Sequence, residues 1–138
     1  MDQETFVKLL NEDLSSEYQS IIQYIQHGAT FTGPEFLAVA DEIRRHLPQE
    51  LAHAQVLAEQ ISFLGGTPTS DVSTVRPASG AQDALLADLR LESEQLGRYR
   101  ERFGQAAELG LADVAEALRP LLAQTQEHVR DLQTALGR

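Results

Sequence analysis

Residues 50–61 read ELAHAQVLAEQI and residues 125–136 read TQEHVRDLQTAL, so a histidine and the apolar positions around it occur twice in the chain. The histidines are His53 and His128, and leucine or isoleucine follows each of them at helical spacing. In the first stretch the histidine closes a Glu-x-x-His motif that begins at Glu50. Residues three apart on a helix lie on one face about one turn apart, so Glu50 and His53 project together.

The separation in sequence between His53 and His128, which we call the repeat offset, also separates many other pairs of identical or similar residues. It relates Glu17 to Glu92 and Tyr24 to Tyr99, so each glutamate precedes its histidine by the same distance in sequence. Aspartate and apolar positions follow the same rule, in the pairs Asp13/Asp88, Leu10/Leu85, Leu14/Leu89, Val39/Val114, Ile43/Leu118, Leu47/Leu122, Leu57/Leu132 and Ile61/Leu136. A repeat that carries both core positions and metal-ligand residue types predicts two related helical hairpins around one site.

Helical periodicity and turn-forming residues divide the chain into four long helices. We expect them at about 3–30, 34–64, 81–109 and 113–136. Asp2 and Ser79 are the expected N-terminal caps of the first and third helices. Pro48 falls inside the second helix, where we expect a kink or local loosening. Residues 65–80 are rich in Gly, Pro, Ser and Thr and predict an irregular connection.

Helix lengths place the polar residues of both hairpins at one height. With a rise of about 1.5 Å per residue, Glu17 lies roughly 20 Å before the first turn and Glu50 roughly 24 Å after it. The second hairpin gives roughly 26 Å out from Glu92 and roughly 24 Å back to His128. The connection between the hairpins can extend to roughly 50 Å, enough to cross the whole bundle. The expected fold is an all-α four-helix bundle, a single domain over residues 1–138, in which a long crossover joins two antiparallel hairpins.

The composition limits the classes of function. A formal net charge of −10 argues against nucleic acid as a partner, because phosphate binding needs a basic surface. The chain has no cysteine, which excludes disulfides and thiolate metal sites. No run approaches the roughly 18 apolar residues of a membrane span, and the opening MDQETFVKLL lacks the pattern of a secretory signal. We therefore expect a soluble, cytoplasmic protein that binds neither membrane nor nucleic acid.

Carboxylates at apolar helix positions indicate a metal site. Glu17 and Glu92 lie among apolar residues at helical spacing, so both point into the bundle together with Glu50 and His53. Buried carboxylates are costly unless they are paired or bind a cation. One Glu from each of two helices plus Glu-x-x-His from each of the other two is the ligand pattern of di-iron carboxylate bundles.

Over nearly its whole length the chain resembles the bacterioferritin-type, ferritin-like family. The resemblance lies in four segments, one for each helix: LNEDLSSEYQSIIQY at 10–24, ELAHAQVLAEQISFLGGTPT at 50–69, LRLESEQLGRYR at 89–100 and TQEHVRDLQTAL at 125–136. It implies a ferritin-like four-helix bundle with a metal site between the hairpins. The implied metal ligands are Glu17, Glu50, His53, Glu92 and His128.

The resemblance also implies what each ligand does. Glu17 and Glu92 correspond to terminal carboxylates, and Glu50 corresponds to a carboxylate that bridges two metals. Each of the two histidines would supply one nitrogen ligand to one metal. Tyr24, one heptad after Glu17, would lie beside the metals and donate a hydrogen bond or an electron.

Three features depart from the family pattern. Thr125 stands where the second bridging Glu belongs, which leaves three carboxylates and two imidazoles. Water or hydroxide could fill the gap, one metal could be lost, or Glu127 could be recruited, although Glu127 is rotated about 200° away on the helix. Leu51 occupies the place of the haem-ligating Met, so no haem is expected. After the fourth helix the chain ends at Arg138, so we expect no fifth helix of the kind that lines pores in the large ferritin cage.

Carboxylate and imidazole ligands suit iron, and we expect a di-iron site, with mononuclear iron, manganese or zinc as alternatives. The expected function is oxidation of Fe(II) by O2 or peroxide, in iron handling or in protection from oxidative stress. Loss of one bridging carboxylate also leaves room for a di-metal oxidase or oxygenase that acts on an organic substrate. A third interpretation is a non-catalytic helical bundle with a degenerate metal site. We expect a homo-oligomer, a dimer at least.

Four further side chains are expected to have no part in binding metal at this site. His46 is interpreted as a packed or solvated histidine, with a place on an iron entry route as the alternative. His27 has no acidic partner at ligand spacing and is interpreted as a surface or packing residue. Arg102 is interpreted as part of a solvated helix face. Tyr99, the repeat partner of Tyr24, is expected to pack or to form a hydrogen bond.

Overall fold

The computed structural model describes the backbone of residues 1–138 and every side chain except that of Glu35. The described residues form four α-helices and no strand: α1 (Gln3–Thr30), α2 (Leu37–Phe63), α3 (Ala81–Glu108) and α4 (Ala112–Ala135). A short 3-10 helix, η1 (Pro34–Phe36), separates α1 from α2. The predicted all-α fold is confirmed, and the helix ends agree with the sequence prediction to within a few residues.

Short polar contacts set the helix starts. The Asp2 side chain accepts a hydrogen bond from the Thr5 backbone N at 2.7 Å, as predicted for the cap of α1. The prediction for α3 was wrong, because Gly80 rather than Ser79 is the cap residue. Ser79 instead donates from its backbone N and its hydroxyl to Asp83, at 2.9 and 3.3 Å. The chain before α3 is therefore held by a side chain inside the helix.

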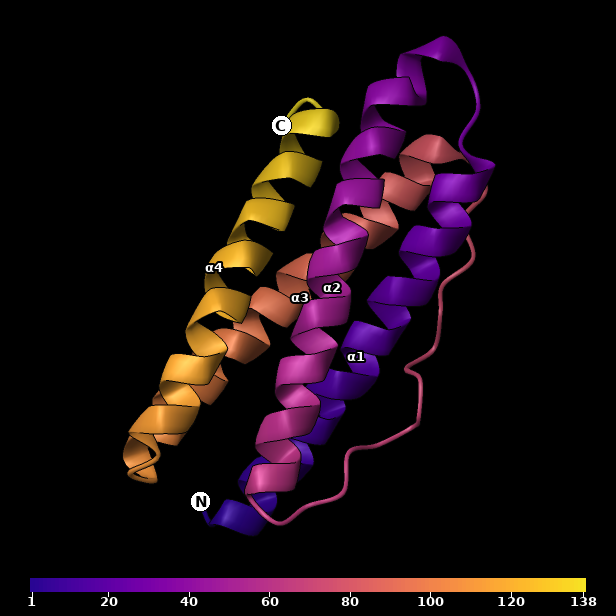
Figure 1. Cartoon of the computed structure of the whole chain (residues 1–138). Helices are drawn as coiled ribbons and strands as arrows, with labels where there is room; N and C mark the ends of the chain where they lie inside the picture. Colours follow the sequence, from indigo (N-terminus) through magenta and orange to yellow (C-terminus); the bar gives the residue numbers. More distant parts are fainter.

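Two hairpins and a crossover make up the bundle. Helix α1 packs against α2 and helix α3 against α4, and contacts between α1 and α3 and between α2 and α4 join the hairpins. The connection between α2 and α3 runs along the outside of α1, as Figure 1 shows. Hydrogen bonds of 2.8–3.2 Å tie it to α1: Asn11 and Ser15 donate to the carbonyls of Thr67 and Asp71, and accept from the backbone N of Thr69 and Ser73. The predicted long crossover is confirmed, and side chains of α1 hold it along its length.

Turn geometry explains two of the glycines. Gly65 follows α2 with φ of 87°, and Gly110 lies between α3 and α4 with φ of 74°. Side chains with a Cβ rarely adopt this left-handed backbone conformation, so glycine lets both helices end sharply. The α3–α4 connection is consequently short enough to keep the second hairpin antiparallel.

The apolar core is divided into two clusters along the bundle. One cluster contains Phe6, Leu10, Leu14, Leu57, Ile61, Val114 and Leu118. The other contains Tyr24, Ile43, Leu85, Leu89, Leu96, Val129 and Leu132. Buried polar residues lie near the middle of all four helices, and several of them form the candidate site. Among the described residues, no helix is both long and apolar enough to cross a membrane.

Candidate metal centre

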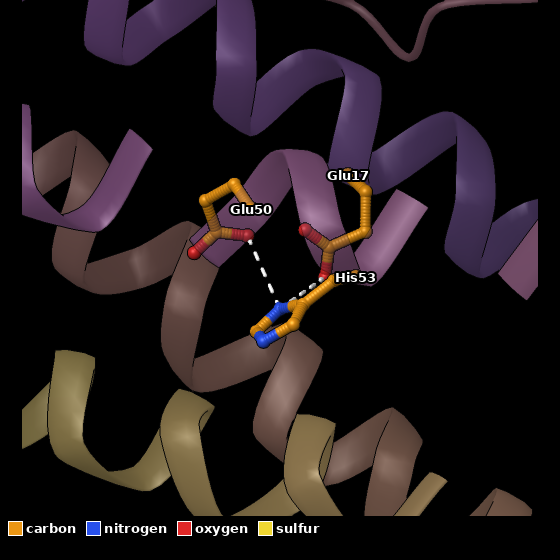
Figure 2. A group of neighbouring side chains, drawn as sticks. All are labelled: Glu17, Glu50 and His53. Atoms are coloured by element: carbon orange, nitrogen blue, oxygen red, sulfur yellow. Dashed lines mark ion pairs between the residues drawn. The ribbon is translucent and has the colours of Figure 1, made fainter. Parts of the chain in front are cut away.

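The five predicted ligands meet in the middle of the bundle. All five side chains are at most 1 % exposed. They are Glu17 on α1, Glu50 and His53 on α2, Glu92 on α3 and His128 on α4. We call this set the five-residue cluster. Figure 2 shows its first half, in which Glu17 and Glu50 approach the ring of His53 from two helices. Helix periodicity alone brings Glu50 and His53 to one face, whereas the other approaches depend on the packing of the hairpins.

Glu50 connects two halves of the five-residue cluster. Its Oε2 lies 3.6 Å from Nδ1 of His53, and its Oε1 lies 2.7 Å from Nδ1 of His128. Glu17 Oε1 completes the first half at 3.6 Å from His53 Nδ1, and Glu92 Oε2 completes the second at 3.6 Å from His128 Nδ1. Within each half, one donor atom from each residue lies within 4.8 Å of the others. The cluster therefore contains two three-residue metal-binding geometries that share one carboxylate.

Unpartnered donor atoms show that the cluster fits a metal. Glu17 Oε2 and His53 Nδ1 have no hydrogen-bond partner among the described residues, and Glu50 Oε1 and His128 Nδ1 face each other at 2.7 Å. An unsatisfied buried polar atom costs about 1–3 kcal/mol, so unpartnered atoms inside the cluster are expensive without a ligand. Carboxylate oxygen and imidazole nitrogen are donors that iron, manganese and zinc accept. The residues present thus suit a divalent transition metal.

Two glutamines orient the histidines. His53 Nε2 lies 2.7 Å from Oε1 of Gln124, and His128 Nε2 lies 2.5 Å from Oε1 of Gln49. A carboxamide oxygen only accepts hydrogen bonds, so each imidazole keeps its proton on Nε2 and presents Nδ1 to the cluster. Sequence reasoning missed both glutamines. The sequence could have indicated them, because the repeat offset relates Gln49 to Gln124. Gln49 lies one helical turn before His53, and Gln124 lies one turn before His128.

Two tyrosines hold the outer carboxylates in crossed pairs. Tyr24 on α1 donates its hydroxyl to Glu92 Oε1 on α3 at 2.7 Å, and Tyr99 on α3 donates to Glu17 Oε1 on α1. Burial, followed by the nearby carboxylates, raises the pKa of both tyrosines, so they remain O–H donors. Tyr24 lies beside the cluster as predicted, and Tyr99 forms the hydrogen bond that the sequence allowed.

A second crossed pair flanks these contacts, and it corrects the interpretation of two residues. Arg102 Nε lies 2.9 Å from Asp13, and His27 Nδ1 lies 2.9 Å from Asp88. Arg102 is only 3 % exposed, so its interpretation as a solvated residue was wrong, and the buried His27 has an acidic partner that sequence spacing did not indicate. The repeat offset relates Asp13 to Asp88 and His27 to Arg102. Both pairs bridge α1 and α3, where each base faces an acid from the other hairpin.

The carboxylates of the cluster ionise unequally. Burial, and then repulsion from Glu17 and Glu92, raises the pKa of Glu50 well above its usual range. Burial acts to raise the pKa of Glu92 as well, but hydrogen bonds with His128, Glu50 and Tyr24 outweigh it and lower this pKa to about 2. Glu92 is therefore ionised at neutral pH, and Glu50 is the carboxyl that retains a proton in the metal-free cluster.

The position of Thr125 follows the repeat. Thr125 is fully buried on α4 one turn before His128, and its hydroxyl has no hydrogen-bond partner among the described residues. Glu127 is exposed, in agreement with its predicted rotation away from the site. Leu51, which the sequence resemblance placed at a haem-ligating Met, is 52 % exposed. The second half of the cluster consequently has one carboxyl group fewer than the repeat would supply.

Comparisons with known proteins agree with this geometry. The family described as "Ferritin-like domain" matches residues 7–138. Bacterioferritin from Mycobacterium leprae (strain TN) is 28 % identical over 132 residues, which cover 95 % of this chain and 83 % of that protein. Bacterioferritin from Streptomyces coelicolor is 29 % identical over 134 residues, covering 94 % and 78 %. A crystal structure described as ferritin like, diiron-carboxylate proteins, from Bacillus anthracis str. Ames, superposes with a TM-score of 0.94, 32 % identity and 99 % coverage of both chains.

Proposed function

Because the chain belongs to the ferritin-like family, we propose that it handles iron, binding Fe(II) at the five-residue cluster and supporting its oxidation by O2 or peroxide. The observation that carries this proposal is the placement of Glu50, which directs one oxygen to each histidine from the centre of the cluster. In this proposal Glu50 would be a ligand in both halves of the cluster, while Glu17 and Glu92 would each be a ligand in one half. When bound, iron supplies the electrons, since two Fe(II) that each lose one electron reduce O2 with two protons to hydrogen peroxide.

The surrounding residues would prepare the cluster for a cation. Gln49 and Gln124 keep the proton of each histidine on Nε2, so that both Nδ1 atoms can bind metal without first losing a proton. Tyr24 occupies Oε1 of Glu92 and leaves Oε2, which faces His128, for the metal. Tyr99 donates to Oε1 of Glu17, whose Oε2 has no partner among the described residues. Glu50 has to give up its proton when a cation binds. Tyr24, which donates a hydrogen bond to Glu92, would also donate an electron, and this is part of the proposal.

Thr125 bears on the oxidised product more than on the substrate. Two Fe(II) carry four positive charges and two Fe(III) carry six, against three carboxylates in the cluster. Electrostatic attraction grows with the product of the charges, so a missing carboxylate weakens binding of the ferric state more than that of the ferrous state. We therefore propose that Fe(III) leaves this cluster more readily than it would with Glu in place of Thr125.

Self-association is proposed alongside iron handling. Large apolar side chains are exposed on α1 and α2, where Ile25 is 53 %, Leu37 68 % and Phe63 71 % exposed. Burying such side chains between copies of the chain would be favourable, because apolar area removed from water contributes about 25 cal/mol per Å². A dimer or larger homo-oligomer is the expected state, and light scattering after size exclusion would measure it.

An anaerobic titration with Fe(II), followed by admission of air, tests the function. We expect two tightly bound equivalents per chain that oxidise rapidly, and a Glu50→Gln variant that binds Fe(II) more weakly and oxidises it more slowly. Glu59→Gln, the same substitution at an exposed position of α2, is the matched control and should behave as the wild type. One equivalent would indicate a mononuclear site. Absence of tight binding would reject iron handling at this cluster and favour the non-catalytic bundle.

The di-metal enzyme alternative is tested in the same preparation. Thr125 is smaller than Glu and would leave coordination space beside the metals, which an organic substrate could occupy. Oxygen consumption in the presence of bound Fe(II) separates the alternatives. If oxidation stops after each iron has turned over once, the iron itself is the substrate. Continued O2 consumption that depends on an added organic compound and a reductant would favour the oxygenase.

A further inference from the structure

A second cluster of metal-binding side chains lies beside the five-residue cluster and shares no residue with it. His46 on α2 places Nε2 3.0 Å from Asp131 Oδ2 on α4 and 3.5 Å from Glu42 Oε1 one turn earlier on α2. One donor atom from each of the three residues lies within 4.8 Å of the others. We call these residues the outer triad. Two carboxylates and one imidazole form a donor set that suits divalent transition metals rather than Mg²⁺ or Ca²⁺.

The outer triad is open to solvent on its carboxylate side. The His46 side chain is 3 % exposed, while those of Glu42 and Asp131 are 25 % and 42 % exposed. Both carboxylates line a surface pocket of about 410 Å³ together with Arg45, Glu127, Arg130 and Thr134. A cation from solvent would therefore meet hydrated carboxylates first and a buried imidazole nitrogen behind them.

The internal repeat shows that the fold does not require this polar group. The repeat offset relates Glu42, His46 and Asp131 to Ala117, Leu121 and Val56. Leu121 is 1 % exposed and belongs to one of the apolar clusters of the core. The same place in the other hairpin is thus filled by apolar packing. A buried His46 with two acidic neighbours consequently needs another explanation than core stability.

The Nε2 atom of His46 faces groups that can themselves bind a cation, unlike the Nε2 atoms of the cluster histidines. The two cluster histidines donate from Nε2 to glutamine oxygens, whereas His46 Nε2 faces only the carboxylates of the outer triad. Its Nδ1 is buried and has no hydrogen-bond partner among the described residues. A cation that binds Nε2 and both carboxylates would replace the existing contact, and the proton would move to Nδ1.

Arg45 competes only weakly for the outer triad. It contacts Oε2 of Glu42, which leaves Oε1 facing His46. The Arg45 side chain is 72 % exposed, and an exposed ion pair of this kind contributes about 0–1 kcal/mol. The pocket is lined by three carboxylates and two arginines, so it still carries net negative charge, in a chain whose formal charge is −10. A divalent cation would be attracted from solvent and would displace Arg45 at little cost.

We propose that Glu42, His46 and Asp131 form a solvent-accessible binding site for a divalent transition-metal cation, distinct from the five-residue cluster. The His46 ring stacks on the ring of His128 with centroids 4.0 Å apart and an interplanar angle of 18°. A cation in the outer triad is thus separated from the five-residue cluster by two stacked imidazoles. The site stands on its own residues and does not depend on iron oxidation at the cluster.

Cobalt(II) titration of the metal-free chain tests the proposal, because Co(II) bound to nitrogen and oxygen ligands absorbs visible light. The titration is made in a background in which Glu17→Gln and Glu92→Gln disable the five-residue cluster. We expect one Co(II) equivalent to remain in this background. Adding Glu42→Gln and Asp131→Asn should raise its Kd at least tenfold or abolish binding.

The matched control adds Asp41→Asn and Glu59→Gln instead, which removes the same charge from exposed positions outside the pocket and should leave the remaining equivalent in place. Equal binding by the outer-triad variant and the control would overturn the proposal, as would a background that binds no Co(II). If the background does not fold, the same two pairs of substitutions are compared in the wild type. There the outer-triad variant should bind one equivalent fewer than the control, and equal stoichiometry would again reject the site. Iron oxidation in the wild type is measured separately, so either proposal can fail alone.

Discussion

Metal binding at the five-residue cluster should release a proton from Glu50 and should strengthen as the pH rises. Burial and the neighbouring carboxylates raise the pKa of Glu50 well above its ordinary value of 4.5. The metal-free folded protein therefore holds a proton that the unfolded chain loses above pH 4.5. The stabilisation of the metal-free protein by this proton is fully present below pH 4.5. It is lost as the pH rises through the pKa of Glu50 in the folded state. A cation replaces this proton, so its affinity changes in the opposite direction over the same range.

The size of the effect follows from one displaced proton per cluster. Each pH unit then changes Kd tenfold, which corresponds to about 1.4 kcal/mol. At a fixed excess of metal, this free energy adds directly to the stabilisation of the folded state. For a domain of this size, about 1 kcal/mol shifts Tm by about 4 °C. The difference in Tm between loaded and metal-free protein should therefore widen by about 5 °C per pH unit between about pH 5 and the raised pKa of Glu50.

Thermal unfolding with and without Mn(II), which air does not oxidise readily, measures this difference across the pH range. Calorimetric titration in two buffers of different ionisation heat counts the protons released. The Glu50→Gln variant should release one proton fewer than the wild type, and Glu59→Gln should release the same number. The reasoning is refuted if Glu50→Gln releases as many protons as the wild type, or if the metal-induced shift in Tm does not change with pH.

Three substitutions extend these expectations. Thr125→Glu should restore a fourth carboxylate, tighten Fe(III) binding at least tenfold and slow its release to a chelator. Tyr99→Phe should leave a buried oxygen of Glu17 without its donor and lower metal-free stability by about 1–3 kcal/mol in denaturant unfolding. Gln49→Leu should free the His128 ring from its hydrogen bond and weaken Mn(II) binding by about 10–100-fold, measured by calorimetry.

Each of these expectations has an outcome that contradicts it. Unchanged Fe(III) release from Thr125→Glu would mean that the missing carboxylate does not control the ferric state. Tyr18→Phe alters a partly buried tyrosine outside the cluster and is the control for Tyr99→Phe. An equal loss of metal-free stability in both variants would show that the loss does not come from the hydrogen bond of Tyr99. Gln55→Leu changes an exposed glutamine of the same helix, so equal weakening there would show that Gln49 does not act through His128.

Crossed contacts between the repeats are the main feature that sequence reasoning did not find. The repeat offset identified Asp13 with Asp88 and Tyr24 with Tyr99, yet it did not say which residue each one contacts. In the structure every such contact joins one repeat to the other, as Tyr24 to Glu92 and Asp88 to His27 do. Partners 61–89 residues apart depend on how α1 and α3 face one another, and no local pattern contains that information.

The surroundings of His46 could not be predicted from its neighbours in sequence. Its nearest acidic neighbour on the same helix face, Glu42, is of a kind common on any helix surface and carries little information. Asp131 completes the outer triad from α4, 85 residues away. Only the packing of α2 against α4 brings these side chains together, and so the residue was interpreted as packed or solvated.

Patterns along one dimension were enough to locate the four helices and the residues that form the five-residue cluster. Helical periodicity is a local property, and residues at i and i+3 share a face in any α-helix, so Glu50 and His53 could be paired from their spacing. The repeat then supplied Glu17, Glu92 and His128. Three-dimensional packing was needed to establish which oxygen meets which nitrogen, which bases pair with the two buried aspartates, and where the outer triad lies. These contacts depend on the rotation of each helix about its axis and on the angles at which the helices cross, which the packing of the whole core determines.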